Sequence, residues 1–285
     1  MKKTIVFALI VIGMAAVNFA SADTIRGINM DFVNIGNAGN AGDTRDEANP
    51  YGCGAVGYGY RIGKYEVTAA QWQTINTAAG IGGSGDWSGN QPVAAISWYE
   101  AAQFCNYLTS GNKYSGAYKF DISGNFQEID RAASISTYGT TYVIPTEDEW
   151  YKAAYFKPDA SGYSSYANGT DIAPIAGVNS NYNMAIGAPW VITNGTTEQN
   201  GTFDMMGNVF EWNETIVYDS CRGVRGGSYD NLDYDLCSYA RPDYDDYYNP
   251  YNEGYGIGFR VASIPEPATL LLLTLGGLFL RKRKV

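Results

Sequence analysis

The sequence predicts one loop-rich α+β domain over residues 23–262, between two short terminal targeting segments. Three helix starts share one capping device, a Ser or Thr followed three residues later by Glu or Gln. The stretches between and after these helices are rich in Gly, Asn, Ser and Tyr and show neither a helix nor a strand period. No internal repeat divides the 285 residues. The capping pairs are Thr68 with Gln71, Ser97 with Glu100, and Thr146 with Glu149.

Residues 1–22 read as a secretory signal peptide. Lys2 and Lys3 precede an apolar run, and Ala20-Ser21-Ala22 has the small-residue pattern of a signal-peptidase site. We therefore expect export and cleavage after Ala22. A non-cleaved anchor is the alternative, but the apolar run is short for a membrane span.

The C-terminal segment, residues 263–285, has three parts in a fixed order. Pro265-Glu266-Pro267 is followed by the apolar run 268–280 and then by the basic cluster 281–284. A helix over the apolar run would reach only about 20 Å, against roughly 30 Å of hydrocarbon. By the positive-inside rule, the basic cluster stays cytoplasmic and the domain lies outside the inner membrane. A plain tail anchor would explain the apolar run but leave Pro-Glu-Pro without a reason.

This tail resembles the PEP-CTERM sorting signal. The resemblance implies recognition by an exosortase-type protease near Pro-Glu-Pro and a transient membrane anchor through the C-terminal helix. It also implies release to the cell envelope or the extracellular space.

The body of the chain is strongly acidic. Six of the 19 basic residues lie in the terminal segments, which leaves 13 basic and 29 acidic residues in 23–267, a net charge of −16. Such a surface repels nucleic acid and anionic lipid, so we expect no nucleic-acid partner. The charge could attract cations or basic partners, or only keep an extracellular protein soluble.

Regular structure is expected in a few places only. Residues 23–59 form no predicted element, and Tyr60–Thr68 reads as a strand. Each capping pair then opens a helix with an apolar face, and Pro158 ends the third. The apolar faces are Trp72, Ile75 and Ala79; Trp98, Ala101, Ala102 and Cys105; and Trp150, Ala153 and Ala154.

The absence of histidine excludes several enzyme classes. Ser-His-Asp triads, Cys-His dyads and three-histidine iron sites all need it, and the chain has none. Four cysteines lie in the exported body, where disulfides can persist. Their spacing leaves three connectivities open and matches no Cys-x-x-Cys metal site.

Six motifs, in this order, resemble the sulfatase-modifying factor family, the formylglycine-generating enzyme domain, over residues 59–262. The resemblance implies a C-type-lectin-like fold with little regular secondary structure and calcium as a structural ion. In the catalytic branch it implies a copper-dependent oxidase that converts a sulfatase cysteine to formylglycine. The motifs are Ile62-Gly-Lys-Tyr-Glu-Val-Thr68, Pro92-Val-Ala-Ala-Ile-Ser-Trp98, Ile144-Pro-Thr-Glu-Asp-Glu-Trp150, Phe203-Asp-Met-Met-Gly-Asn-Val-Phe-Glu-Trp212, Arg225-Gly-Gly-Ser-Tyr229 and Ile257-Gly-Phe-Arg-Val-Ala262.

The resemblance places a calcium site in the fourth motif. Its ligands would be the side chains of Asp204 and Glu211 and the backbone carbonyls of Gly207 and Val209. Such hard oxygen ligands suit calcium. The alternative makes Asp204 a turn cap and Glu211 a solvated charge.

The catalytic match is incomplete. Active members place two cysteines just after the Gly-Gly-Ser motif, where two thiolates bind Cu(I). Here Ser228 matches the motif's serine, but only Cys237 follows, and Phe210 stands where the family has tryptophan. Copper is therefore not expected. We expect Cys237 to pair with Cys221 instead, in a loop whose closure would contribute roughly 3 kcal/mol.

The region in which the family's substrate groove lies has an unusual composition. Residues 229–255 carry eight tyrosines and seven acidic residues. Tyrosine faces beside carboxylates could stack on sugar rings, grip a basic peptide, or only fill a surface layer. The predicted groove residues are Tyr229, Tyr234, Arg241, Tyr244, Tyr247 and Tyr248.

Two functions follow as hypotheses. The first is a calcium-stabilised, non-catalytic member of this family that binds polysaccharide or a matrix protein outside the cell. The second is a formylglycine-generating or related oxidase with a divergent site, in which Ser228 and Cys237 would be the reactive residues.

Overall fold

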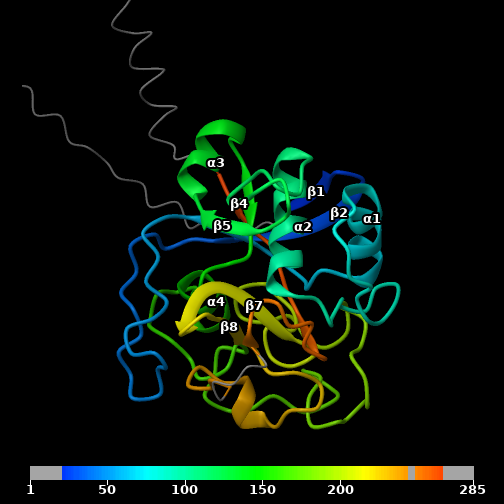
Figure 1. Ribbon diagram of the computed structural model, residues 1–285. Coiled ribbons are helices and arrows are strands. Elements are labelled where there is room, and N and C mark those ends of the chain that lie inside the picture. The colour runs from blue at the N-terminus through cyan, green and yellow to red at the C-terminus, as the bar shows by residue number, and fades with distance from the viewer. Residues whose placement is uncertain (1–20, 243–247, 266–285) are drawn as a thin grey trace, which may run out of the picture.

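The computed structural model describes residues 21–242 and 248–265, and the mixed α/β fold with few regular elements is confirmed (Figure 1). The short elements are separated by long loops, and the C-terminal strand returns to the N-terminal half of the chain. The helices are α1 Ala69–Ala79, α2 Trp98–Ser110, α3 Arg131–Tyr138, α4 Glu147–Tyr155 and the 3-10 helix Asp233–Leu236. The strands are β1 Ser21–Ile25, β2 Ile28–Ile35, β3 Tyr60–Gly63, β4 Tyr118–Phe120, β5 Phe126–Ile129, β6 Thr141–Val143, β7 Phe210–Tyr218, β8 Cys221–Arg225, β9 Ile257–Gly258 and β10 Ala262–Ile264.

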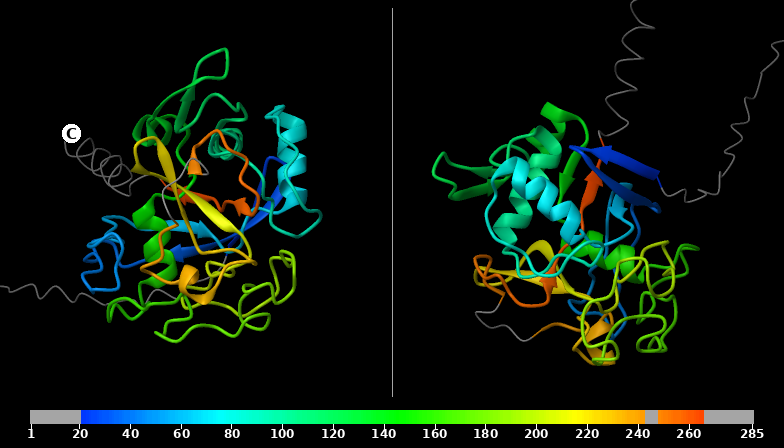
Figure 2. Two further views of the ribbon diagram at one scale, coloured as in Figure 1. Left: turned by 60° about the horizontal axis from the view of Figure 1, so that its bottom comes forward. Right: turned by 90° about the vertical axis from the view of Figure 1, so that its right-hand side faces the viewer.

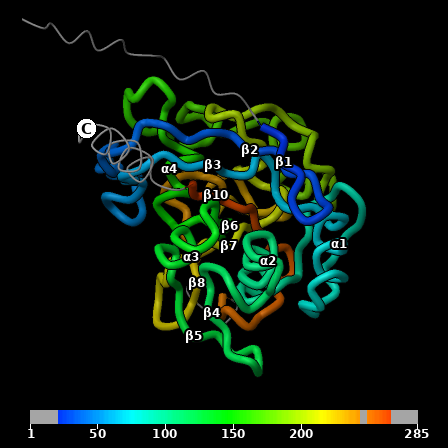
Figure 3. Tube along the Cα trace, turned by 90° about the horizontal axis from the view of Figure 1, so that it is seen from above, coloured from blue at the N-terminus to red at the C-terminus, as the bar shows by residue number. Residues whose placement is uncertain are grey.

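A five-stranded antiparallel sheet in the order β1-β2-β3-β10-β6 joins the two ends of the domain (Figure 3). Ala262 of β10 lies opposite Ile62 of β3 on one side and Val143 of β6 on the other. The domain therefore closes only when its last strand is in place. Residues 266–285, which hold the sorting motif's apolar run and basic cluster, lie outside the described residues.

The three predicted capping boxes are present, and each starts a helix. Gly80 and Gly111 end α1 and α2 in the left-handed conformation, which glycine adopts without strain. The helix α4 ends at Tyr155, ahead of Pro158. Trp72, Trp98 and Trp150, each on a predicted apolar face, are fully or almost fully buried.

A second, three-stranded sheet carries the segments of interest. Its order is β8-β7-β9, with β7 and β8 forming an irregular hairpin and β9 pairing with β7 in parallel. The hairpin lies below the helices α1–α3, beside the loops of residues 158–209 (Figure 1). Trp212 of β7 is fully buried, and its indole N–H donates to the Ile96 carbonyl at 3.0 Å.

Several sequence expectations were wrong in detail. Residues 23–59 do form regular structure, because β1 pairs with β2 from Ser21 opposite Phe32 to Ile25 opposite Ile28. The predicted strand 60–68 ends at Gly63. The helix α3 was not predicted because its sequence has no apolar stripe, and Ser134 is its only buried residue.

The predicted disulfide between Cys221 and Cys237 is not present. None of the four cysteines forms a disulfide bond, and all four are buried. Cys221 begins β8 at the hairpin end, whereas the Cys237 thiol points back into its own turn and donates to the Tyr234 carbonyl at 2.8 Å. The roughly 3 kcal/mol expected from closing this loop therefore does not contribute to the stability of the fold.

No helix in residues 21–242 and 248–265 is long and apolar enough to cross a membrane.

Candidate functional site

Two glycine turns bring the fourth and fifth motifs together. Gly207 N–H donates to the Gly226 carbonyl at 2.7 Å, and Tyr229 N–H donates to the Asn208 carbonyl at 2.9 Å. Gly207 has φ +85°, and a Cβ there would lie 2.2 Å from the Asn181 carbonyl oxygen. Only glycine fits this position, because the backbone around residue 181 approaches too closely for any side chain.

Ser228, the predicted catalytic serine, is engaged by its own turn. Its Oγ lies 2.5 Å from both Asp230 Oδ1 and Asn231 Oδ1, and its backbone N–H donates to Asn231 Oδ1 at 2.9 Å. The side chain is almost fully buried. This hydroxyl holds the turn after Gly227 in shape.

Cys237, the predicted catalytic cysteine, is buried and held as a thiol. Burial raises the pKa of its thiol, whereas a nucleophilic or metal-binding cysteine needs a depressed pKa. It is also the only cysteine in the sequence from Gly226 to Tyr255. The arrangement therefore offers one protonated thiol where a bis-thiolate copper site needs two thiolates.

Tyr229 lies in an aromatic group that spans three separate segments. Trp87, Tyr229 and Tyr255 form what we call the aromatic corner. The Trp87 ring centroid is 6.1 Å from that of Tyr229, at 84°, and 6.1 Å from that of Tyr255. The hydroxyls of Tyr229 and Tyr255 are 3.1 Å apart. Tyr229 is buried and Tyr255 is 56% exposed, so Tyr229 forms the base of the corner and Tyr255 its accessible edge.

A cavity of about 260 Å³ lies beside the corner, between the start of α1 and residues 84–89. Trp72 and Trp87 both line it, and neither indole N–H has a hydrogen-bond partner. Trp87 has φ +70°, an unfavourable conformation for a bulky residue that tends to persist at functional sites.

The other predicted groove residues are dispersed. Tyr234 is 53% exposed on the 3-10 helix. Tyr248 is half-buried and packs against the core. Tyr244 and Tyr247 lie outside the described residues. Among the members of this set that the structure describes, only Tyr229 lies in the aromatic corner.

Arg241 is part of a buried charge cluster. Its Nη2 lies 2.5 Å from Glu147 Oε1, and Arg225 Nη2 lies 2.6 Å from the same oxygen. Despite burial, the two guanidinium groups lower the pKa of the Glu147 carboxyl. The predicted ligand-binding arginine therefore ties the 241 region to the start of α4.

Glu211, a predicted calcium ligand, is fully buried and paired. Arg260 approaches both of its oxygens, with Nη2 at 2.5 Å from Oε1 and Nε at 2.6 Å from Oε2. The Trp150 indole N–H donates to the same Oε2 at 2.7 Å. A cation at Glu211 would have to share this carboxylate with a guanidinium.

Asp204 fits a cation better. Its Oδ1 accepts from the Trp190 indole at 2.9 Å, but its buried Oδ2 has no hydrogen-bond partner. Burial and the Glu198 carboxylate raise the pKa of Asp204 well above its usual value, and burial together with Asp204 does the same to Glu66. An extra proton or a hard cation would relieve this excess of buried negative charge.

Side chains alone do not complete a metal site. Within the described residues, no three Asp, Glu or Cys side chains converge closely enough to hold an ion. A calcium ion at Asp204 would therefore need backbone carbonyls, such as those predicted for Gly207 and Val209.

Sequence reasoning missed Trp87, Tyr255, Glu66 and Arg260. Two signals were available. Trp87 is a large aromatic in the loop Ser84-Gly-Asp-Trp-Ser-Gly89, where a purely connecting segment needs none. Arg260 interrupts an apolar motif, which is typical of a buried, paired charge.

Solved structures share this fold. Treponema denticola variable protein 1 superposes with a TM-score of 0.64 at 21% identity, covering 87% of this chain and 99% of that one. PvdO from Pseudomonas aeruginosa gives 0.57 at 15% identity, with 82% and 94% covered. CarF gives 0.53 at 23% identity, with 82% and 97% covered. At these identities the likeness shows the fold alone.

Sequence comparison adds one curated relative and two family matches. The chaperone protein LppX of Paenibacillus barcinonensis is 28% identical over 179 residues, which is 54% of this chain and 61% of the relative. This chain thus spans less than two thirds of that relative's length. The sulfatase-modifying factor enzyme 1-like domain matches residues 26–264, and the PEP-CTERM protein-sorting motif matches residues 263–284. The sorting motif implies export and recognition by an exosortase at the C-terminal end. The chain therefore belongs to the sulfatase-modifying factor enzyme 1-like domain family and carries a PEP-CTERM sorting motif.

Proposed function

We propose that this protein is a non-catalytic binding protein of the cell envelope or extracellular matrix, and that its ligand is a neutral glycan held at the aromatic corner. The observation that carries the proposal is the grouping of Trp87, Tyr229 and Tyr255 beside a serine whose hydroxyl is already engaged. Tyr229 and Tyr255 lie in the region that the family resemblance assigns to the substrate groove, which supports a binding role for the corner.

The aromatic composition of the corner supports a glycan as the ligand. The Tyr255 ring is 56% exposed, so a ligand can reach it. Aromatic faces suit the apolar faces of sugar rings.

Three features of the site support binding without catalysis. Ser228 is tied to Asp230 and Asn231, Cys237 is a buried thiol with a raised pKa, and no second cysteine follows the Gly-Gly-Ser motif. The rival function is an oxidase that uses Cys237. Two-sulfur copper coordination by X-ray absorption, together with oxygen uptake on a cysteine-containing peptide, would establish the rival and remove the proposal.

The binding test compares two exposed tyrosines on a glycan array and by titration with the bound glycan. Tyr255→Ala removes the accessible edge of the corner and is expected to weaken binding by about tenfold or more, the effect of losing one stacked ring. Tyr138→Ala on α3, which removes another exposed ring, is the control. Equal binding by both variants contradicts the corner, and binding to basic peptides or matrix proteins instead of glycans contradicts the ligand class. Protein binding would fit the chaperone name of the curated relative.

We also propose calcium as a structural ion at Asp204. The unpartnered Oδ2 and the excess of buried carboxyl groups support it. The ion would act on stability, and the glycan proposal does not depend on it.

A further inference from the structure

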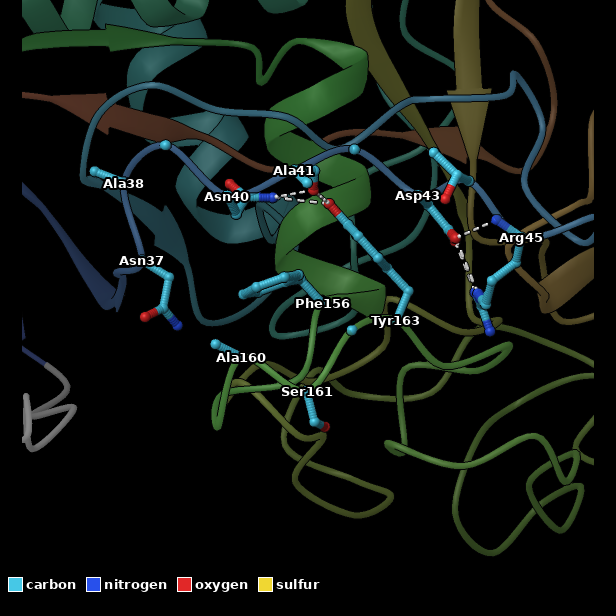
Figure 4. A pocket seen from close by; sticks show the side chains of 14 residues that line it. Asn37, Ala38, Asn40, Ala41, Asp43, Arg45, Phe156, Ala160, Ser161 and Tyr163 are labelled. Atoms are coloured by element: carbon cyan, nitrogen blue, oxygen red, sulfur yellow. Dashed lines mark hydrogen bonds and ion pairs between the residues drawn. The ribbon is translucent and has the colours of Figure 1, made fainter.

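A second cavity, of about 550 Å³, lies between residues 37–45 and the turn at residues 156–163 that follows α4 (Figure 4). The residues 37–45 belong to the loop that leaves β2, on the opposite side of the molecule from the loop that carries Trp87 (Figures 1 and 2). This cavity is therefore separate from the aromatic corner.

Hydrogen bonds fix the wall of this cavity before any ligand arrives. Asn40 Nδ2 donates to the Gly54 carbonyl at 2.7 Å and to the Tyr163 hydroxyl at 2.8 Å, and Asn40 Oδ1 accepts from Val56 N–H at 3.2 Å. The Tyr163 hydroxyl donates to the Ala41 carbonyl at 2.9 Å. Figure 4 shows the Tyr163 side chain reaching Asn40, with a dashed line between the Tyr163 hydroxyl and the Asn40 amide. A fixed wall lowers the entropy cost of binding.

Small residues keep the cavity open. Six of its 14 lining residues are Ala or Gly, so much of the wall is backbone. At Gly42 the choice is forced, because a Cβ would lie 2.0 Å from the Gly52 carbonyl oxygen. The Asn-Ala-Gly-Asn-Ala-Gly-Asp sequence of residues 37–43 therefore produces an open, polar wall.

The lining carries no uncompensated charge. Its charged side chains are Asp43 and Arg45, which are paired at 2.7 Å, and the Tyr151 hydroxyl also donates to Asp43 at 2.7 Å. Lys152 is not a lining residue; it is fully buried, and its ammonium donates to the backbone carbonyl of the lining residue Asn37 at 2.9 Å. An ionic ligand would find no free counter-charge on this wall.

The remaining lining groups are amides, hydroxyls and two aromatic rings. Asn37, Thr44 and Ser161 are exposed and can donate and accept hydrogen bonds, while Phe156 and Tyr163 supply apolar edges. A cavity of this size lies within the range of small-molecule sites, about 300–1,000 Å³. Neutral polar donors and acceptors beside aromatic edges match a polyhydroxylated ligand.

We propose that this cavity is a second binding site, for a short neutral saccharide. If the proposed glycan binding at the aromatic corner also holds, one molecule would carry two saccharide sites on opposite sides. Such a protein could bridge two polysaccharide chains, one at each site.

The experiment measures the stoichiometry and affinity of saccharide binding to the full chain by isothermal titration. The probes are cellobiose, maltose and N,N′-diacetylchitobiose, with glucuronic acid as the charged competitor. Ala38 is exposed and lines the cavity, so Ala38→Trp fills the space from the wall. Ala132→Trp, at an exposed position on α3, adds the same ring elsewhere and is the matched control.

We expect Ala38→Trp to remove one class of sites, with an affinity loss of about tenfold or more there, while Ala132→Trp changes nothing. Ser161→Trp, from the opposite wall, should give the same loss and replaces Ala38→Trp if that variant does not fold. Tyr255→Ala should leave the cavity site intact, so failure of the corner and failure of the cavity are distinguishable. The proposal is overturned if both cavity variants bind like the parent, if glucuronic acid competes better than the neutral sugars, or if no saccharide binds.

Discussion

Arg260 and Glu211 form a completely buried, bidentate ion pair that links the last motif of the domain to the start of β7. Arg260 Nη2 also donates to the Phe203 carbonyl and Nη1 to the Gly63 carbonyl, both at 2.9 Å. One guanidinium thus holds β3, β7 and the residues before β10 together.

Arg260→Met is expected to cost about 3–5 kcal/mol of unfolding free energy, because it leaves Glu211 buried without its counter-charge. Urea unfolding measures the loss. Arg61→Met is the control, since Arg61 pairs with Asp23 at 2.7 Å near the surface and should cost about 1 kcal/mol or less. Similar losses for the two variants would mean that the buried ion pair contributes no more to stability than the surface pair.

Calcium removal tests the cation proposal at Asp204. Chelation is expected to lower the melting temperature of the parent, and Asp204→Asn should remove that response, because the variant no longer offers the unpartnered carboxylate oxygen. A scan with and without chelator and with added calcium gives the result. An equal melting temperature of the parent with and without chelator would contradict a structural calcium ion.

Lys152 should make stability rise with pH above neutrality. Burial lowers the pKa of its ammonium from 10.5 to about 8, and no carboxylate offsets the effect. Between about pH 8 and 10.5 the unfolded chain binds the extra proton, so the penalty present below pH 8 is relieved as the pH rises.

The Lys152 effect is measured as a difference between proteins. Unfolding free energies of the parent and of Lys152→Met are taken at pH 7, 8, 9 and 10. The unfolding free energy of the parent, relative to that of the variant, should increase as the pH rises. Lys119→Met, at a half-buried lysine whose ammonium donates to the Gly116 carbonyl, is the control for the loss of a lysine side chain. A difference for Lys152→Met that does not change with pH would mean that Lys152 is solvated or paired.

Thiol counting tests the absence of disulfides. Alkylation of the unreduced protein in denaturant should modify all four cysteines, because none is bonded, whereas the folded protein should resist alkylation, because all four are buried. Mass spectrometry gives the count, and a reduced sample is the control. Two modified cysteines without reductant, with the unmodified pair mapped to Cys221 and Cys237, would restore the pairing first expected for these two residues.

Some residues of the candidate site could be predicted from the sequence, but their long-range partners could not. Gly207, Gly226 and Tyr229 were identified from their motifs, and the structure places them together. The partners of Glu211 and Arg241 could not be read from the sequence, because Arg260 and Glu147 lie far away along the chain and meet these residues only in the folded core. A sequence does not show whether a carboxylate binds a metal ion or pairs with an arginine.

The sequence by itself determined the local rules of this protein: the three helix starts, the glycine turns, the family motifs in order and the sorting tail. These depend on hydrogen bonds and conformational preferences within a few residues. Only the tertiary structure decided which long-range partners are satisfied. It placed Trp87 against Tyr229 and Tyr255, left Cys221 and Cys237 without a disulfide between them, and opened the cavity beside Asn40. Those outcomes depend on contacts between distant segments, which no local pattern encodes.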